Sequence, residues 1–242
     1  MSYQHESFNI WQNGTYKGLE YIAKCMDMVY HNNYGNSYYL NYGDMSEYNK
    51  IGIAVSGVNS SPTFNVGNSS AQCMHLNSST PYLHIIKTGK VILYGAGKTA
   101  DNADFYGIIR CKCRDLSNPS VYYDCILGNP ISSSGVGTYV VSKLFSYKSS
   151  YCMNSTKFIG KYDSPSTFTG DTVVLIPAVA ITDDTISVSI DGLYTVGLYP
   201  KTGVGYDRIM KQVFTINGDK YIAIKNTGNY TNEDCPMFAV KL

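Results

Sequence analysis

Most of the chain consists of short runs rich in apolar residues and separated by turn residues, and some runs alternate with the period of two of half-buried β-strands. The clearest run is Ile186-Ser-Val-Ser-Ile190. Because no helical pattern recurs between the expected strands, the sequence argues against a parallel α/β sheet. Strands are expected at 37–42, 50–55, 82–87, 90–94, 106–113, 121–127, 139–145, 158–162, 173–179, 186–190, 193–199, 213–216, 219–224 and 237–242, with a loop at 62–79.

Three short turn sequences predict hairpins between neighbouring strands. Asp191-Gly192 and Asn217-Gly218 each lie between alternating runs, and Thr88-Gly89 lies between two apolar runs. Asp-Gly and Asn-Gly tolerate positive φ at both turn residues, as a two-residue type I′ loop requires. The sequence therefore predicts a largely antiparallel arrangement.

One segment, 17–31, has apolar residues at helical spacing and predicts an amphipathic helix covering one face of a sheet. The fold class expected is mainly β, an antiparallel β-sandwich or barrel-like fold with this one N-terminal helix. We expect a single β-rich domain over 1–242. If it divides, the Gly-rich stretch 128–137 would link an N-terminal lobe, 1–128, to a C-terminal hairpin lobe, 138–242.

The amino-acid composition limits which kinds of molecule the chain is expected to bind. Charged residues make up 15% of the chain, against a usual value of roughly 25%, and the difference is filled by 23 Tyr and by Asn, Ser and Gly. The net charge of +1 and the absence of a basic cluster argue against nucleic acid. The sequence shows neither a signal peptide nor an apolar run long enough for a membrane span, so we expect synthesis in a cytoplasm without secretion by a signal peptide.

No motif in the sequence assigns a catalytic, cofactor-binding or metal-binding residue. The run Gly95-Ala-Gly-Lys-Thr99 resembles the second half of a phosphate-binding loop, but Ile92 stands where the first glycine is needed. Cys111, Cys113 and Cys125 lack the second cysteine pair that structural zinc sites use. We therefore expect a protein that is not an enzyme and needs no cofactor.

Tyrosine pairs, the expected helix and the final strand are the candidate contact surfaces. Adjacent tyrosines on a strand point to opposite faces, so one of each pair can be exposed. The candidate interface residues are Leu19, Ile22, Met26, Tyr38, Tyr39, Tyr122, Tyr123, Phe238, Val240 and Leu242.

Four features together resemble a known class of protein. They are the N-terminal helix pattern, the strand sequence Phe105-Tyr106-Gly107-Ile-Ile-Arg110, the hairpin sequence Val213-Phe-Thr-Ile-Asn-Gly-Asp-Lys-Tyr-Ile-Ala-Ile224 and the ending Phe238-Ala-Val-Lys-Leu242. The chain is similar in these to uncharacterised virion proteins of tailed phages and prophages of Firmicutes. The resemblance implies a structural or accessory part on the tail, baseplate, collar or capsid surface, made in the bacterial cytoplasm. It also implies that the part packs in many copies against itself and other virion proteins.

Two alternatives to this interpretation stay open. The Tyr-rich strands and Asn/Ser/Gly loops are also typical of a glycan-binding module that faces the host surface. A polysaccharide hydrolase would need two opposed carboxylates, and the sequence has only scattered ones, most of them at turns.

Overall fold

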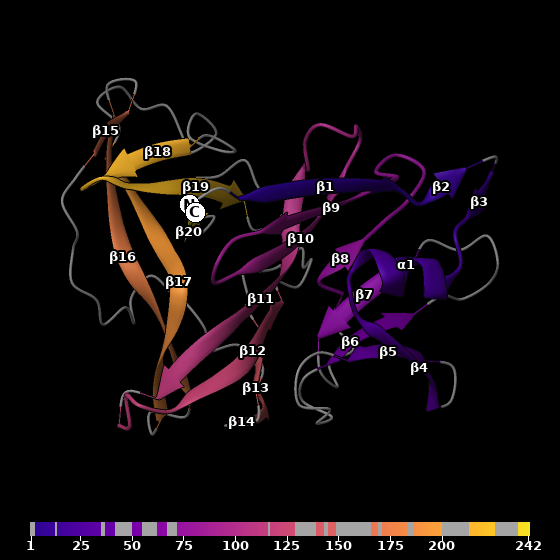
Figure 1. Ribbon diagram of the computed structural model, residues 1–242, viewed down its shortest axis with the longest axis horizontal. Coiled ribbons are helices and arrows are strands. Elements are labelled where there is room, and N and C mark those ends of the chain that lie inside the picture. Colours follow the sequence, from indigo (N-terminus) through magenta and orange to yellow (C-terminus); the bar gives the residue numbers. More distant parts are fainter. Residues whose placement is uncertain are drawn as a thin grey trace.

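The computed structural model shows a mainly β chain whose largest sheet is antiparallel and curls into a half-barrel (Figure 1). Strands therefore dominate as the alternating pattern predicts, whereas the predicted sandwich is not confirmed. The structure describes residues 3–12, 14–34, 37–41, 50–54, 62–66, 72–115, 117–128, 139–142, 145–148, 166–168, 171–182, 186–199, 213–225 and 237–242.

The main sheet has 13 strands, eight of which follow one another along a continuous path. In spatial order these are β1 (Gln4–Asn9), β9 (Tyr82–Lys87), β10 (Ile92–Gly97), β11 (Phe105–Asp115), β17 (Ile186–Tyr199), β20 (Met237–Lys241), β19 (Asp219–Lys225) and β18 (Val213–Ile216). Side branches add β12 (Tyr122–Gly128), β13 (Tyr139–Ser142), β14 (Phe145–Lys148), β15 (Ser166–Phe168) and β16 (Asp171–Thr182). The β11–β17 and β12–β13 pairs join the first half of the chain to the second.

A second sheet of five strands packs with the helix against one face of the main sheet. Its strands are β4 (Val29–Tyr34), β5 (Ser37–Asn41), β6 (Lys50–Ala54), β7 (Thr63–Val66) and β8 (Met74–His75). The helix is α1 (Leu19–Cys25), and β2 (Trp11–Gln12) and β3 (Thr15–Tyr16) form a small separate ribbon. Strands β7 and β8 lie inside the stretch 62–79, so the prediction of a loop there was wrong.

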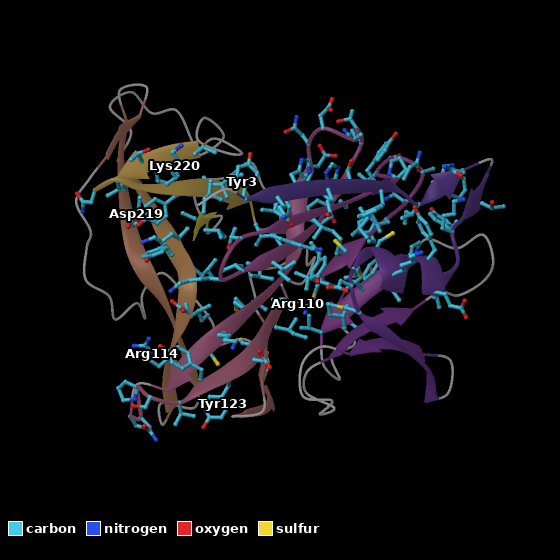
Figure 2. The ribbon with its side chains drawn as sticks, viewed as in Figure 1. Tyr3, Arg110, Arg114, Tyr123, Asp219 and Lys220 are labelled. Carbon is cyan, nitrogen blue, oxygen red and sulfur yellow. The ribbon has the colours of Figure 1, made fainter. Side chains whose placement is uncertain are left out.

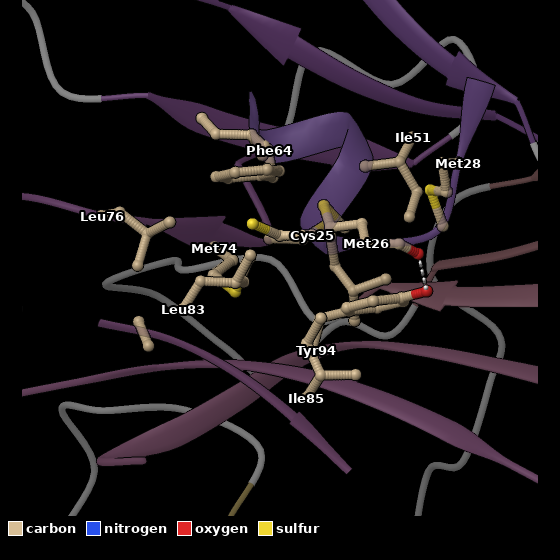
Figure 3. Packing of buried hydrophobic residues seen from close by; sticks show 14 of the residues in the cluster. Cys25, Met26, Met28, Ile51, Phe64, Met74, Leu76, Leu83, Ile85 and Tyr94 are labelled. Atoms are coloured by element: carbon tan, nitrogen blue, oxygen red, sulfur yellow. Dashed lines mark hydrogen bonds between the residues drawn. The ribbon is translucent and has the colours of Figure 1, made fainter. Parts of the chain in front are cut away.

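Two apolar clusters fill the two faces of the central strands. On one face Leu83, Ile85 and Tyr94 pack with α1 and the second sheet (Figure 3). On the other face Ile86, Leu93 and neighbouring strands pack together. Because both faces are covered, the central strands read as nearly continuous apolar runs rather than as an alternation.

A buried guanidinium ties the helical segment to the main sheet. Arg110 Nη1 donates a hydrogen bond to the Tyr94 hydroxyl at 2.7 Å. That hydroxyl donates to the Met26 carbonyl oxygen at 3.2 Å (Figure 3). Tyr94 has no exposed surface and Arg110 has 9%. The Cys73 thiol lies in the same apolar cluster as Tyr94, and its burial raises its pKa to about 12.

The helix is shorter than the pattern 17–31 predicts. It begins after Gly18 and ends at Cys25, and Asp27 follows with φ of +53°. From Val29 onward the chain forms β4 and pairs with β5. The left-handed Asp27 ends helical geometry, and β-branched and aromatic residues after it favour the strand.

Two of the three predicted hairpin turns are confirmed. β18 and β19 pair through Asn217 and Gly218, whose φ values are +52° and +84°. β9 and β10 pair around Thr88–Val91, where the Thr88 hydroxyl accepts from the backbone N–H of Val91 at 3.0 Å. Local turn chemistry was sufficient at both places.

The predicted hairpin at Asp191-Gly192 was wrong. The residues on either side of it belong to one strand, β17, which lies along β16 for its whole length. Gly192 has φ of +78°, and the register between β16 and β17 shifts beside it. The other edge of β17 pairs with β11 as far as Ile190 and with β20 from Leu193. The dipeptide is therefore a bulged corner at which β17 changes its partner.

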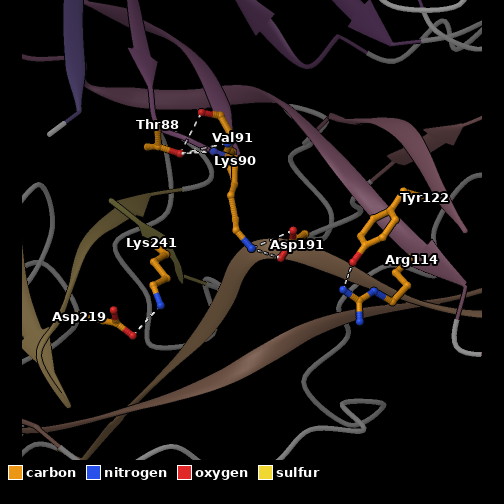
Figure 4. Close-up of polar contacts among 8 residues, drawn as sticks. All are labelled: Thr88, Lys90, Val91, Arg114, Tyr122, Asp191, Asp219 and Lys241. Atoms are coloured by element: carbon orange, nitrogen blue, oxygen red, sulfur yellow. Dashed lines mark hydrogen bonds and ion pairs between the residues drawn. The ribbon is translucent and has the colours of Figure 1, made fainter. Parts of the chain in front are cut away.

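This corner is held by a contact from the β9–β10 turn. Lys90 Nζ lies 2.8 and 2.9 Å from the two carboxylate oxygens of Asp191 (Figure 4). A Cβ on Gly192 would lie 3.0 Å from Lys90 Cβ and 3.2 Å from Val91 Cγ2. Glycine is needed here both for its φ value and for the close approach of the turn.

Candidate interaction surfaces

The end of the β11–β12 ribbon carries one exposed aromatic ring among charged side chains. The register sets Lys112 opposite Asp124 and Arg114 opposite Tyr122, so all four lie on one face. Tyr122 is 45% exposed. The Arg114 guanidinium lies 4.6 Å from the centre of the Tyr122 ring and donates to its hydroxyl (Figure 4). These contacts hold the ring in one orientation toward solvent.

The reverse face of the ribbon is part of the protein core. Cys111, Cys113 and Cys125 are buried there, and Tyr123 packs against them. Tyr123 and Arg114 both lie toward the end of the ribbon remote from Arg110 (Figure 2). The prediction that adjacent tyrosines divide between two faces is confirmed at Tyr122 and Tyr123.

Strand β1 forms one end of the main sheet. Among the described residues it pairs with β9 alone. Its first three residues, Gln4, His5 and Glu6, are exposed, and the Glu6 carboxylate lies 3.7 Å from Lys87 Nζ. Polar and charged side chains on an edge strand limit unspecific pairing with other sheets.

The direction of the β1 backbone groups follows from one hydrogen bond. The N–H of Ile10 donates to the carbonyl oxygen of Pro81 at 2.9 Å, in the same register as the rest of the β1–β9 pair. In an antiparallel pair every second residue turns its N–H and C=O toward the partner. The even-numbered residues of β1 therefore face β9, and His5, Ser7 and Asn9 direct their N–H and C=O groups outward.

A histidine pair fastens β1 to the sheet. His84 is fully buried, and its Nε2 lies 2.8 Å from the carbonyl oxygen of Thr99. A carbonyl only accepts, so in the neutral ring the proton is on Nε2 and Nδ1 accepts from His5 Nε2 at 3.0 Å. The rings are nearly parallel, at 11°. The pair links the edge strand to the loop after β10.

Most of the apolar candidate contacts are used inside the chain. Ile22, Met26 and Val240 have no exposed surface, Leu242 has 8%, and Leu19 is half-buried. The first four side chains are thus not available to a second molecule in this fold, because the chain's own clusters surround them. β20 is paired on both sides, with β17 and β19, so it cannot extend a neighbour's sheet.

The other candidates are placed only by their strands. Tyr38 and Tyr39 lie in β5, between β4 and β6, and Phe238 lies in β20. Their side chains fall outside the described residues. The expectation that the Tyr38–Tyr39 pair forms a contact surface stays a prediction.

The glycine-rich run at the end of β10 is explained by packing. Gly97 closes β10, and a Cβ on it would lie 2.6 Å from His84 Nε2 and 2.4 Å from the Asn102 carbonyl oxygen. The chain then bends, and Lys98 N–H donates to an Asp104 carboxylate oxygen at 3.1 Å. Among the described residues no group of three or more His, Cys, Asp or Glu side chains is arranged to hold a metal ion.

Long-range partners were the residues that sequence reasoning missed. His5 and His84 are 79 residues apart, and Lys90 and Asp191 are 101 apart. None of the four residues belongs to a motif in its own segment that would have indicated the partner. Only the position of Asp191 beside a glycine marked a special backbone site in advance.

Comparison with known proteins finds no relative of this chain. Neither a protein-family model, nor a curated protein, nor a solved structure matches the chain. In the described part of the chain, no helix has the length and apolar character needed to cross a membrane.

Proposed function

We propose that this chain is a non-enzymatic structural or accessory component of a tailed-phage particle, which acts by packing in many copies on the tail, baseplate, collar or capsid surface. The observation that carries the proposal is the edge of β1, where three residues direct backbone hydrogen-bonding groups away from the sheet. An open edge is a ready site for a strand from another chain.

The burial pattern supports the same conclusion. The two apolar clusters occupy both faces of the central strands, so those faces are covered by the chain itself and the edge of β1 stays at the described surface. A rigid sheet with a polar edge suits repeated contacts in a symmetric assembly. The resemblance of the Val213–Ile224 hairpin and the C-terminal strand to virion proteins agrees with this role.

Two measurements test the proposal together. Mass spectrometry of phage particles purified from the strain that carries the gene should detect the chain in a fixed ratio to the other structural proteins. Light scattering after gel filtration should show assemblies larger than the monomer as concentration rises. A chain absent from the particles and monomeric at millimolar concentration would refute the proposal.

The Tyr122–Arg114 face favours a second candidate, recognition of a host-surface glycan. An exposed, oriented aromatic ring beside hydrogen-bonding groups is suited to stacking against a sugar. Binding of labelled cell-wall polymer should fall at least about tenfold in Tyr122→Ala, with Tyr21→Ala, another exposed tyrosine, as the control. Equal binding by both variants would eliminate this candidate.

A further inference from the structure

We infer that two copies of this chain pair through β1, antiparallel to each other, about a two-fold axis that passes beside Ser7. The inference rests on the proposed function and deepens it by naming the partner, a second copy, and the register of the contact. Strand β1 supports the inference because the direction of its outward backbone groups and the exposure of its side chains are both described.

Backbone geometry restricts how two such edges can meet. Hydrogen-bonded positions of an antiparallel pair must be residues whose N–H and C=O both point into the contact. Within β1 these residues are His5, Ser7 and Asn9. Only pairings that set one of these three opposite another of them are therefore allowed.

Side-chain charge and strand length then select one register. A two-fold axis at Glu6 would set the two Glu6 carboxylates opposite each other, which is destabilising. An axis at Phe8 would bond Ser7 with Asn9 but leave His5 outside the contact, and an axis at His5 or Asn9 would bond only that residue with its own copy. An axis at Ser7 bonds all three, with His5 opposite Asn9 and Ser7 opposite its own copy, and it sets Glu6 opposite Phe8. This register leaves no like charges opposed.

The β1–β9 pairing makes the contact surface rigid before association. The His5–His84 hydrogen bond and the Glu6–Lys87 ion pair both hold β1 in place. Little conformational entropy is therefore lost when a second copy adds to the edge. The result is one isologous interface, and it leaves the β18 end of each sheet outside the contact.

Proline at Ser7 tests the contact without disturbing the fold. Ser7→Pro removes an N–H that points away from β9, and proline is tolerated where an edge strand faces solvent. We expect the dimer dissociation constant, measured by analytical ultracentrifugation, to rise about tenfold or more, with the melting temperature unchanged at concentrations where the wild type is monomeric. Ser7→Ala keeps the N–H and should dimerise like the wild type.

Cysteine pairing tests the register separately. Ser7→Cys should form a disulfide-linked dimer with oxidised glutathione, because opposite Cα atoms in the hydrogen-bonded position lie about 5.5 Å apart. Glu6→Cys should not, since its own copy lies diagonally across the strands at about 7–8 Å. The wild type, run in parallel, sets the background from native thiols, of which those in the described residues are buried.

The outcomes separate this inference from the proposed function. A Ser7→Pro chain that dimerises as tightly as Ser7→Ala, or a Ser7→Cys chain that yields no more linked dimer than Glu6→Cys, overturns the β1 contact. Detection of the same chain in purified particles would then still support the structural role. A β1 dimer in a chain that particles lack would support the contact and refute the role.

Discussion

Replacing the hydroxyl of Tyr94 should cost the protein a large part of its stability. Tyr94→Phe keeps the ring in its apolar cluster but removes the acceptor of Arg110 Nη1 and the donor to the Met26 carbonyl oxygen. A hydrogen bond from a charged donor contributes about 1.5–3 kcal/mol and a neutral one about 0.5–1.5 kcal/mol. We expect a loss of about 2–4 kcal/mol in the free energy of unfolding.

Urea denaturation followed by fluorescence measures this loss through the midpoint and slope of the transition. Tyr21→Phe is the matched control, since Tyr21 is 39% exposed, and its change should stay within about 0.5 kcal/mol. Thermal unfolding should show a drop of roughly 4–16 °C for Tyr94→Phe in a chain of this size.

A double-mutant cycle tests the cause. In an Arg110→Met background the Tyr94→Phe change should cost at least about 1 kcal/mol less than in the wild type, because the charged partner is gone. The Arg110 Nη1 to Met26 oxygen distance is already 3.5 Å, so a small movement could restore one bond. A loss below about 0.5 kcal/mol for Tyr94→Phe would refute the assigned network.

Three further predictions concern the corner of β17 and the buried thiol. Gly192→Ala should destabilise by about 2–3 kcal/mol and Gly218→Ala by about 1–2 kcal/mol, because both have positive φ but only Gly192 is crowded; equal losses in urea titrations would contradict the crowding. Lys90→Met should cost about 0.5 kcal/mol, since its ion pair with Asp191 is partly exposed, and the difference should fade in 1 M salt; a loss that salt does not change would contradict an ionic origin. Burial raises the pKa of the Cys73 thiol from 9.0 to about 12, so the folded chain keeps a proton that the unfolded chain releases between these values. Stability relative to Cys73→Ala should therefore be constant below pH 9 and fall by about 1.4 kcal/mol per pH unit above it, as pH-dependent urea titrations can show; a flat difference would contradict the raised pKa.

The local sequence was sufficient to predict strand positions and turns that depend only on residues close together along the chain. Short apolar runs bounded by turn residues placed β9, β11 and β12 to within two residues, and the two-residue period of a strand divided Tyr122 from Tyr123. Turn chemistry located the hairpin at Asn217. These features need only the two-residue period of a strand and the backbone freedom of a few turn residues.

Tertiary structure decided what those strands pair with. Asp191-Gly192 carries the same turn signal as Asn217-Gly218, yet it became a bulged corner because β16, β11 and β20 compete for the two edges of β17. The predicted helix stopped at Cys25 for a similar reason, since the residues after it found a strand partner in β5.

The candidate surfaces divide in the same way. The sequence by itself named both Tyr122 and Tyr123 as candidates, and the structure exposes Tyr122 while Tyr123 packs against the core. The sequence could not show that β1 is an edge and β20 is interior, because strand order depends on contacts between residues far apart in the chain. Hydrophobic pattern fixes which face of a strand is buried, whereas the choice of neighbour is made by the free energy of the whole sheet.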